Sequence, residues 1–208
     1  MIVFRFCKLN GAEFIPHLDI LRHIQRTLRR MGLKVNYSQG FNPHMLVYLS
    51  SPLPLGLKSE SEFCVVDADG GADGFVEKFN SHTHRGVKCM EAYAVEKKPN
   101  VAADITAATY VISGLDKFNP DLILSGEDFI LTDKKGRRIN AREKIEDLRF
   151  SGGNLVARLK FGGDGLRADI LVEELKRRFG GEHPVIVKKE AHFLNGLSFE
   201  EYIKAYHG

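Results

Sequence analysis

The first hundred residues switch between strand and helix periodicity in an order that fits few folds. Residues 2–9 alternate as a strand does, and a helical pattern runs from Pro16 to about Met31 and stops at Gly32. Strand signals at residues 45–50 and 62–67 come next, and a short helix and a fourth strand then follow at residues 72–81 and 87–95. Strand–helix–strand–strand–helix–strand is the order of the ferredoxin-like split βαβ fold. The sequence therefore predicts an α+β fold whose ferredoxin-like N-terminal domain covers residues 1–97.

The remaining residues predict a second α+β domain over residues 105–208, a degenerate copy of the first. Residues 97–104 contain lysines, a proline and small residues, as linkers do. Hairpin signals lie at residues 133–136 and 151–154, a helix at 167–179 and a strand at 185–193. Ser198 and Glu201 have the spacing of a capping box, which predicts a last short helix.

Composition narrows the class of protein. No apolar run approaches the roughly 18–20 residues needed to span a bilayer, and the first residues lack the zones of a signal peptide. We therefore expect a cytoplasmic protein that does not contact a membrane. The oligomeric state is left open.

The cysteines exclude several kinds of site. Cys7, Cys64 and Cys89 are odd in number and far apart, which argues against a disulfide framework and a CxxC metal clip. It also excludes the cysteine triplet that holds the cluster of radical S-adenosylmethionine (SAM) enzymes. We expect three small buried side chains, with no metal and no cofactor.

Positive charge is concentrated at the start of the chain. Residues 1–58 carry eight Lys or Arg against two Asp or Glu, although the whole chain has a net charge of only +3. Within the predicted first helix Arg22, Arg26 and Arg29 line one face, with Arg30 beside them, opposite an apolar stripe that includes Leu18. Arginine forks match phosphate oxygens, which predicts an anion- or RNA-binding face. The alternatives are a solvated helix face or ion pairs with Glu60 and Glu62.

The loop after this helix is rich in groups that recognise nucleotides. It offers aromatic rings for stacking and polar groups for hydrogen bonds, and we predict that Tyr37, Ser38, Phe41, Asn42 and His44 bind RNA. Gly40 would allow a turn with positive φ. A plain crossover between helix and sheet is the alternative. His17 and His44 are the candidate catalytic residues, as general acid and base.

Several motifs follow one another at tight spacing, and together they resemble the signature of the radical-SAM-linked protein family. They are His17-Leu18-Asp19, Arg22, Arg26, Arg29-Arg30, residues 37–44, Pro52-Leu53-Pro54-Leu55-Gly56, Ser59 and Glu62. The resemblance is dense over residues 1–67 and weak beyond residue 100. One departure is Met45, where family members often carry proline.

The resemblance implies a partner. The family is a bacterial domain of unknown function that occurs alone or fused to radical SAM proteins, and it is linked with RNase E/G-type ribonucleases. It implies a radical SAM protein as partner, here on a separate chain, and an RNA context. By fold analogy alone, paired ferredoxin-like domains also resemble CRISPR repeat-RNA endoribonucleases.

Three functions are therefore open. The first is an RNA-binding module that acts with a radical SAM enzyme in maturation or modification of ribosomal or transfer RNA. The second is a metal-independent ribonuclease or phosphoryl-transfer enzyme, and the third is a protein-interaction partner that never contacts RNA. Because proline and glycine impose specific turns, we expect residues 17–30, 37–44 and 52–62 to converge on one concave site, with structural or interface roles for Asp19, Gly40, Gly56 and Glu62.

Overall fold

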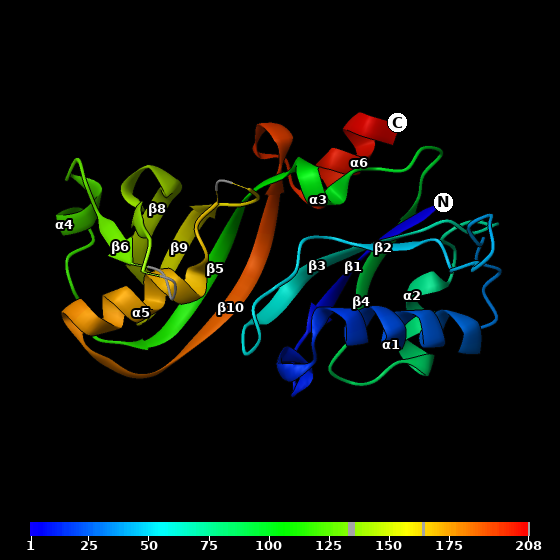
Figure 1. Cartoon of the computed structure of the whole chain (residues 1–208), viewed down its shortest axis with the longest axis horizontal. Helices are drawn as coiled ribbons and strands as arrows, with labels where there is room; N and C mark the ends of the chain where they lie inside the picture. Colours follow the sequence, from blue (N-terminus) through cyan, green and yellow to red (C-terminus); the bar gives the residue numbers. More distant parts are fainter. Residues whose placement is uncertain (133–135, 164, 208) are drawn as a thin grey trace. The chain divides into compact units, whose positions relative to one another are not determined.

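The computed structural model (Figure 1) describes residues 1–132, 136–163 and 165–207, and the chain divides into two compact units. Unit 1 consists of residues 1–104 together with residues 197–208, and unit 2 consists of residues 105–196. The unit boundary follows the expected linker. The last residues differ from expectation, because the sequence assigns them to the second domain, whereas they pack within unit 1. No helix in the described ranges is long and apolar enough to cross a membrane.

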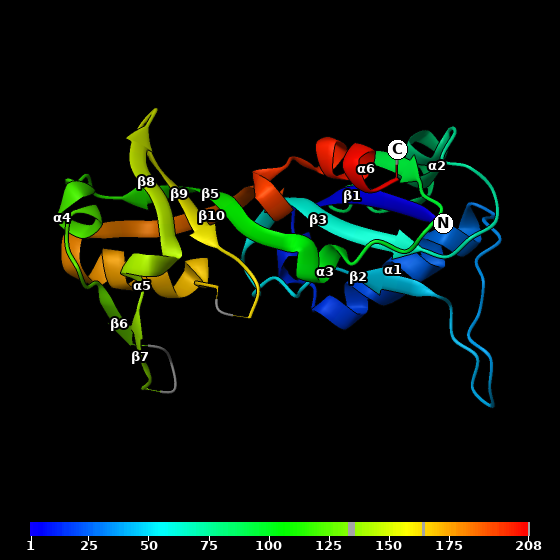
Figure 2. The same cartoon turned by 90° about the horizontal axis from the view of Figure 1, so that it is seen from above.

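Unit 1 has the ferredoxin-like topology that the sequence predicts. Its elements are β1 (Ile2–Lys8), the 3-10 turn η1 (Ala12–Phe14), α1 (His17–Arg30), β2 (Val47–Leu49), β3 (Lys58–Val66), α2 (Phe75–His82), β4 (Cys89–Ala94), α3 (Val101–Asp104) and α6 (Phe199–His207). The strands lie in the order β4-β1-β3-β2, and every neighbouring pair is antiparallel. Helices α1 and α2 lie on one face of this sheet and α6 on the other (Figures 1 and 2).

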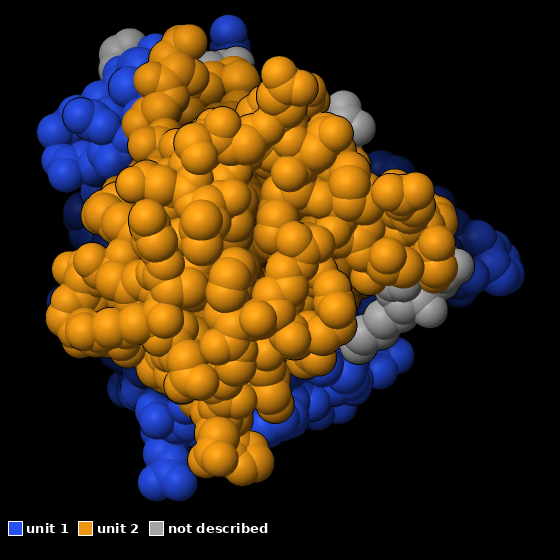
Figure 3. Space-filling view, turned by 90° about the vertical axis from the view of Figure 1, so that its left-hand side faces the viewer, with its two compact units in different colours: residues 1–104, 197–208 blue, residues 105–196 orange. Residues whose placement is uncertain are grey.

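Unit 2, drawn in orange in Figure 3, repeats the same strand order. Its elements are β5 (Ile105–Leu115), α4 (Asp121–Leu124), β6 (Ile130–Thr132), β7 (Arg138–Asn140), η2 (Arg142–Lys144), β8 (Ile145–Ser151), β9 (Asn154–Lys160), α5 (Ala168–Phe179), β10 (Gly181–Phe193) and η3 (Leu194–Gly196). The sheet order is β10-β5-β9-β8, all antiparallel. Unit 2 is thus a degenerate ferredoxin-like fold, because α4 and the β6–β7 pair occupy the connection where unit 1 has α1.

Two of three local predictions for these later residues can be compared with the structure. The helix predicted at 167–179 is α5, and the turn predicted at 151–154 joins β8 to β9, where Ser151 pairs with Asn154. The other predicted turn includes residues 133–135, which lie outside the described residues. The strands β6 and β7 that flank it are paired.

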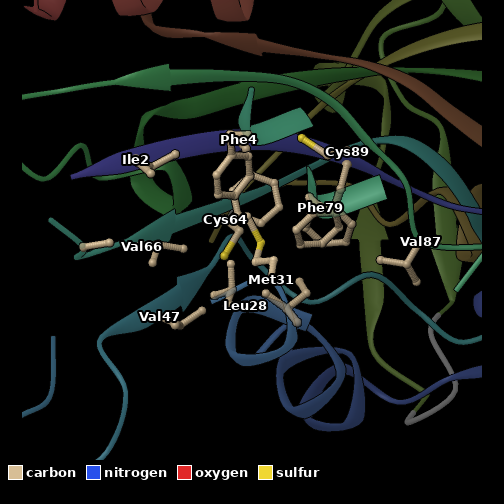
Figure 4. Close-up of a cluster of buried hydrophobic side chains, with 14 of the residues drawn as sticks. Ile2, Phe4, Leu28, Met31, Val47, Cys64, Val66, Phe79, Val87 and Cys89 are labelled. Atoms are coloured by element: carbon tan, nitrogen blue, oxygen red, sulfur yellow. The ribbon is translucent and has the colours of Figure 1, made fainter. Parts of the chain in front are cut away.

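The core of unit 1 lies between the sheet and helices α1 and α2 (Figure 4). From α1 it receives Ile20, Ile24 and Leu28, one helical turn apart, which meet Phe4 and Cys64 of the sheet. The prediction that Leu18 belongs to the apolar stripe of this helix is wrong. Leu18 is 62% exposed, because it lies only about 40° around the helix from Arg22 and so shares the solvent face.

All three cysteines are buried in strands of unit 1, as free thiols. Cys64 and Cys89 belong to the core in Figure 4. Burial raises the pKa of the Cys89 thiol to about 12 and also raises that of Cys64. These thiols therefore act as small apolar side chains.

The opposite face of the unit 1 sheet is covered by α6. The ring of Phe199 packs 4.8 Å from Phe63 and 5.4 Å from Tyr93, centroid to centroid. Tyr202 is fully buried, and its hydroxyl donates a 2.6 Å hydrogen bond to Asp104. The predicted capping box forms, because the Ser198 hydroxyl and backbone N–H both donate to the Glu201 carboxylate. This face of the sheet is therefore closed by a helix of the same unit.

Candidate functional site

The solvent face of α1 carries three of the predicted arginines. Arg22 donates to the Asp19 carboxylate at 2.7 Å, in an exposed pair. Arg29 reaches the Tyr37 hydroxyl at 3.5 Å, which links the helix to the start of the following loop. Arg26 lies between them, exposed, with no hydrogen bond or ion pair to any residue that the structure describes. Its guanidinium is free to meet an external anion.

Arg30, the fourth arginine predicted to bind RNA, makes contacts within the chain. Its guanidinium donates at 2.8 Å to the carbonyl of His82 and at 3.1 Å to the hydroxyl of Thr27. Close by, the His23 ring nitrogen Nε2 lies 2.8 Å from the Thr83 hydroxyl. These contacts tie α1 to the end of α2, so Arg30 stabilises the helix pair.

The connection from α1 to β2 forms a narrow hairpin that reaches away from the sheet (Figure 2). Ser38 and His44 close it. The Ser38 N–H donates to the His44 carbonyl, the Ser38 hydroxyl lies 2.8 Å from His44 Nδ1, and the His44 N–H donates back to that hydroxyl. Gly40 has φ +124°, which strongly favours glycine. The tip beyond this clamp presents Asn42 and the ring of Phe41, which is 100% exposed.

A second group of predicted residues surrounds a small cavity at the other end of α1. The polar lining consists of Lys8, His17, Ser50 and Glu62, and the apolar lining of Phe6, Ile20, Leu49 and Leu53. Leu53 in this lining comes from the Pro-rich segment 52–56. The segment is held in place where the Gly56 N–H donates 2.9 Å to the Glu13 carbonyl, and Gly56 adopts φ +85°.

The charges around the cavity are almost completely buried. Lys8 is 4% exposed and Glu62 is 6% exposed. One oxygen of Glu62 accepts a 2.8 Å hydrogen bond from the Ser59 hydroxyl. Burial lowers the pKa of the Lys8 ammonium, an effect that the charges of Glu62 and Glu13 oppose. Burial also lowers the pKa of His17, and the Lys8 charge acts in the same direction while Glu62 opposes it.

The structure brings the predicted site residues together in two groups. Arg22, Arg26, Arg29 and Tyr37 follow the solvent face of α1 toward the hairpin, whereas His17 and Glu62 meet at the cavity. The lining of this cavity includes none of the hairpin residues 37–44. His17 and His44, the predicted acid and base, thus belong to different groups.

Sequence reasoning missed Lys8 and Ser50 at the cavity. Lys8 ends a strand and has the pattern of a solvent-exposed terminal residue. Its burial depends on the pairing of β1 with β3, where Lys8 faces Ser59 across the strands. Only the alternation of β1 could have indicated that Lys8 is buried, because it places Lys8 on the same face as Phe4 and Phe6.

Unit 2 also has a polar hollow, but its charges largely satisfy one another. The lining includes Thr109, Glu146, Arg158 and His192. The Thr109 hydroxyl lies 2.8 Å from His192 Nε2, and Arg158 lies 2.9 Å from Glu146. No group of three or more His, Cys, Asp or Glu residues in the described ranges is arranged to hold a metal ion.

Stability should fall on mild acidification because of buried histidines. The pKa of His23 is lowered from 6.5, first by burial and then by the charges of Arg30, His84 and Arg26, and burial likewise lowers the pKa of His17 and His192. Below pH 6.5 the unfolded chain therefore binds more protons than the folded chain, and the free energy of unfolding drops as the pH falls through the folded-state pKa values. Urea unfolding between about pH 7.5 and about pH 5.5 measures this loss. His23→Gln should show a shallower dependence, and equal slopes for the two proteins would contradict the assignment.

Comparison with known proteins identifies a family. A family model described as "uncharacterized protein conserved in bacteria (DUF2344)" matches residues 1–173, which contain the hairpin, the arginines and the cavity. No curated protein matches the chain.

Proposed function

Because the chain belongs to the DUF2344 family of uncharacterized proteins conserved in bacteria, we propose its function from its geometry: it is an RNA-binding module. The RNA would be a structured ribosomal or transfer RNA, presented to a separate radical SAM enzyme that matures or modifies it. The observation that carries the proposal is the exposed Arg22–Arg26–Arg29 face of α1, which continues at Arg29 into the aromatic hairpin.

The arginine face suits a phosphate backbone. Arg22 and Arg29 are separated by seven residues, or roughly 10 Å along the helix axis, with Arg26 between them. Arg26 has no partner within the described chain, and Arg22 holds only a solvent-exposed pair, which contributes little and is easily exchanged. Guanidinium groups on one helix face can therefore bind successive phosphates.

The hairpin supplies what arginines lack, which is contact with bases. The Phe41 ring is completely exposed, and Tyr37 is 44% exposed. Exposing such a ring to water is unfavourable unless a partner covers it, and aromatic rings stack on unpaired RNA bases at about 1–3 kcal/mol per base. The Ser38–His44 clamp holds the base of the hairpin, so the tip is presented in a defined conformation.

The radical SAM partner follows from the motifs of residues 17–62. These resemble a domain that occurs alone or fused to radical SAM proteins. The three cysteines are buried in three different strands, so an iron–sulfur cluster of the radical SAM type would belong to the partner chain.

Binding of a transfer RNA by fluorescence anisotropy at several salt concentrations tests the proposal. We expect the double variant Arg22→Ala plus Arg26→Ala to weaken binding roughly tenfold per arginine, because each charged hydrogen bond contributes about 1.5 kcal/mol or more. The slope of log K against log salt should also become shallower by about 0.7–0.9 for each lost phosphate contact. Lys176→Ala plus Arg177→Ala, on the exposed side of α5, removes the same charge elsewhere and is the matched control. Undetectable RNA affinity, or equal losses in both double variants, would refute the proposal.

The other two functions have less support. A ribonuclease with His17 and His44 as acid and base requires both groups at one phosphate, whereas they belong to separate groups of residues here. A purely protein-binding role would be favoured by one result. Arg26→Glu would then abolish co-purification with a radical SAM protein and leave RNA affinity unchanged.

A further inference from the structure

The helix α1 and the hairpin that follows it present different chemistry to a nucleic acid. The solvent face of α1 presents the guanidinium groups of Arg22, Arg26 and Arg29. The hairpin tip, residues 39–43, is exposed throughout and contains no charged side chain. Guanidinium groups suit phosphates, whereas an uncharged tip with an aromatic ring suits a base. The two parts therefore recognise two different features of one RNA.

The arginines favour a regular phosphate backbone. Arg22 and Arg26 are four residues apart and Arg26 and Arg29 three, or roughly 6 Å and 4.5 Å along the helix axis. The opposite face of α1 packs in the core, so the helix holds this row straight. Phosphates along one strand of a base-paired stem also follow a regular path, whereas a free single strand must first be ordered at a cost in entropy. The row of guanidinium groups therefore favours a stem.

The hairpin tip favours an unpaired base. The Phe41 ring is 100% exposed, and the amide side chains of Gln39 and Asn42 are exposed on either side of it in the sequence. Bases inside an RNA stem are already stacked, and the narrow major groove does not admit side chains. An aromatic ring therefore stacks on a base that is unpaired, and amide groups can bond to the edge of that base.

The two parts lie close enough to contact one short stretch of RNA. Arg29 reaches the Tyr37 hydroxyl at 3.5 Å, and Phe41 follows Tyr37 by four residues, at most roughly 14 Å of chain. We propose that the RNA element recognised is a stem with an unpaired nucleotide beside it, whose stem phosphates contact α1 and whose unpaired base stacks on Phe41. This inference rests on the proposed RNA-binding function and names the element that is bound.

Three synthetic RNAs test the inference. They are a blunt duplex, the same duplex with one bulged 2-aminopurine, and the single strand that carries this 2-aminopurine. Fluorescence anisotropy at one fixed salt concentration gives the affinities. We expect the bulged duplex to bind about tenfold more tightly than the other two, because it alone offers both the stem and the unpaired base. The fluorescence of 2-aminopurine should fall on binding, since stacking quenches it.

Phe41→Ala separates the two contributions. It should lower the affinity for the bulged duplex about tenfold, to that of the blunt duplex, and abolish the fluorescence change. Its affinity for the blunt duplex should stay unchanged, because Phe41 carries no charge and α1 is intact. The matched control is Phe14→Ala, which removes a ring that is 69% exposed but lies outside the hairpin, and it should behave as the parent does.

The outcomes distinguish this inference from the proposed function. If none of the three RNAs binds, RNA binding itself is refuted. If all three bind equally well, or if Phe41→Ala weakens all three by the same factor, RNA binding stands and recognition of an unpaired nucleotide beside a stem is overturned.

Discussion

Replacing Tyr202 with alanine is expected to lower the free energy of unfolding by about 3–5 kcal/mol, the usual range for a large buried aromatic side chain. Tyr202 is fully buried and is anchored by the hydrogen bond from its hydroxyl to Asp104. Its loss would open a cavity beneath α6 and loosen Phe199 from Phe63 and Tyr93. Urea unfolding measures the effect. Because Cys7, Cys64 and Cys89 all lie in unit 1, their reactivity with a thiol reagent reports on that unit alone.

Tyr202→Phe is the matched control for the hydroxyl. It keeps the ring and loses only the bond to Asp104, so it should cost about 1–2 kcal/mol. If alanine costs no more than phenylalanine, α6 does not close the sheet in solution.

Replacing Glu62 with glutamine is expected to destabilise unit 1 by about 3 kcal/mol, because a buried charge then loses its compensating partner. Burial lowers the pKa of Lys8, and the charge of the Glu62 carboxylate is the larger of the two that oppose this shift. Glu62 and Lys8 line the same cavity. Glutamine has nearly the same volume, so the loss reports charge and not packing. Thiol reactivity in urea again gives the free energy for unit 1.

A double variant distinguishes charge compensation from other effects. Lys8→Met plus Glu62→Gln removes both charges, and replacement of buried ions by neutral groups is often close to neutral. The double variant should therefore recover to within about 1 kcal/mol of the parent. If the two single losses simply add, Lys8 and Glu62 are not coupled.

Much of the fold could be predicted because it is encoded locally. The strong helical period of α1 and α5, the glycine turn at residues 151–154 and the Ser198–Glu201 capping box are each readable within a few residues. The order of these patterns then selected the ferredoxin-like topology. By contrast, nothing near Phe199 or Tyr202 indicates which sheet face α6 covers, because docking depends on residues about a hundred positions away.

The candidate site was likewise predictable only where it depends on residues close together in the sequence. The arginine face and the Gly40 turn follow from spacing and residue type, and the structure has both. The expected single concavity depended on how loops fold back in three dimensions, and the residues form two groups instead. Lys8 was missed because its burial arises from strand pairing with Ser59, which the sequence near Lys8 does not record.

The discontinuity of unit 1 affects how the protein is made. Residues 105–196 are synthesised between the first part of unit 1 and the α6 segment that covers its sheet. At typical translation rates the ribosome needs roughly 5–20 s to add them. During that time Phe63 and Tyr93 have no Phe199 to pack against, so the nascent chain presents an uncovered apolar sheet face. This interval is when a ribosome-associated chaperone would have most to protect.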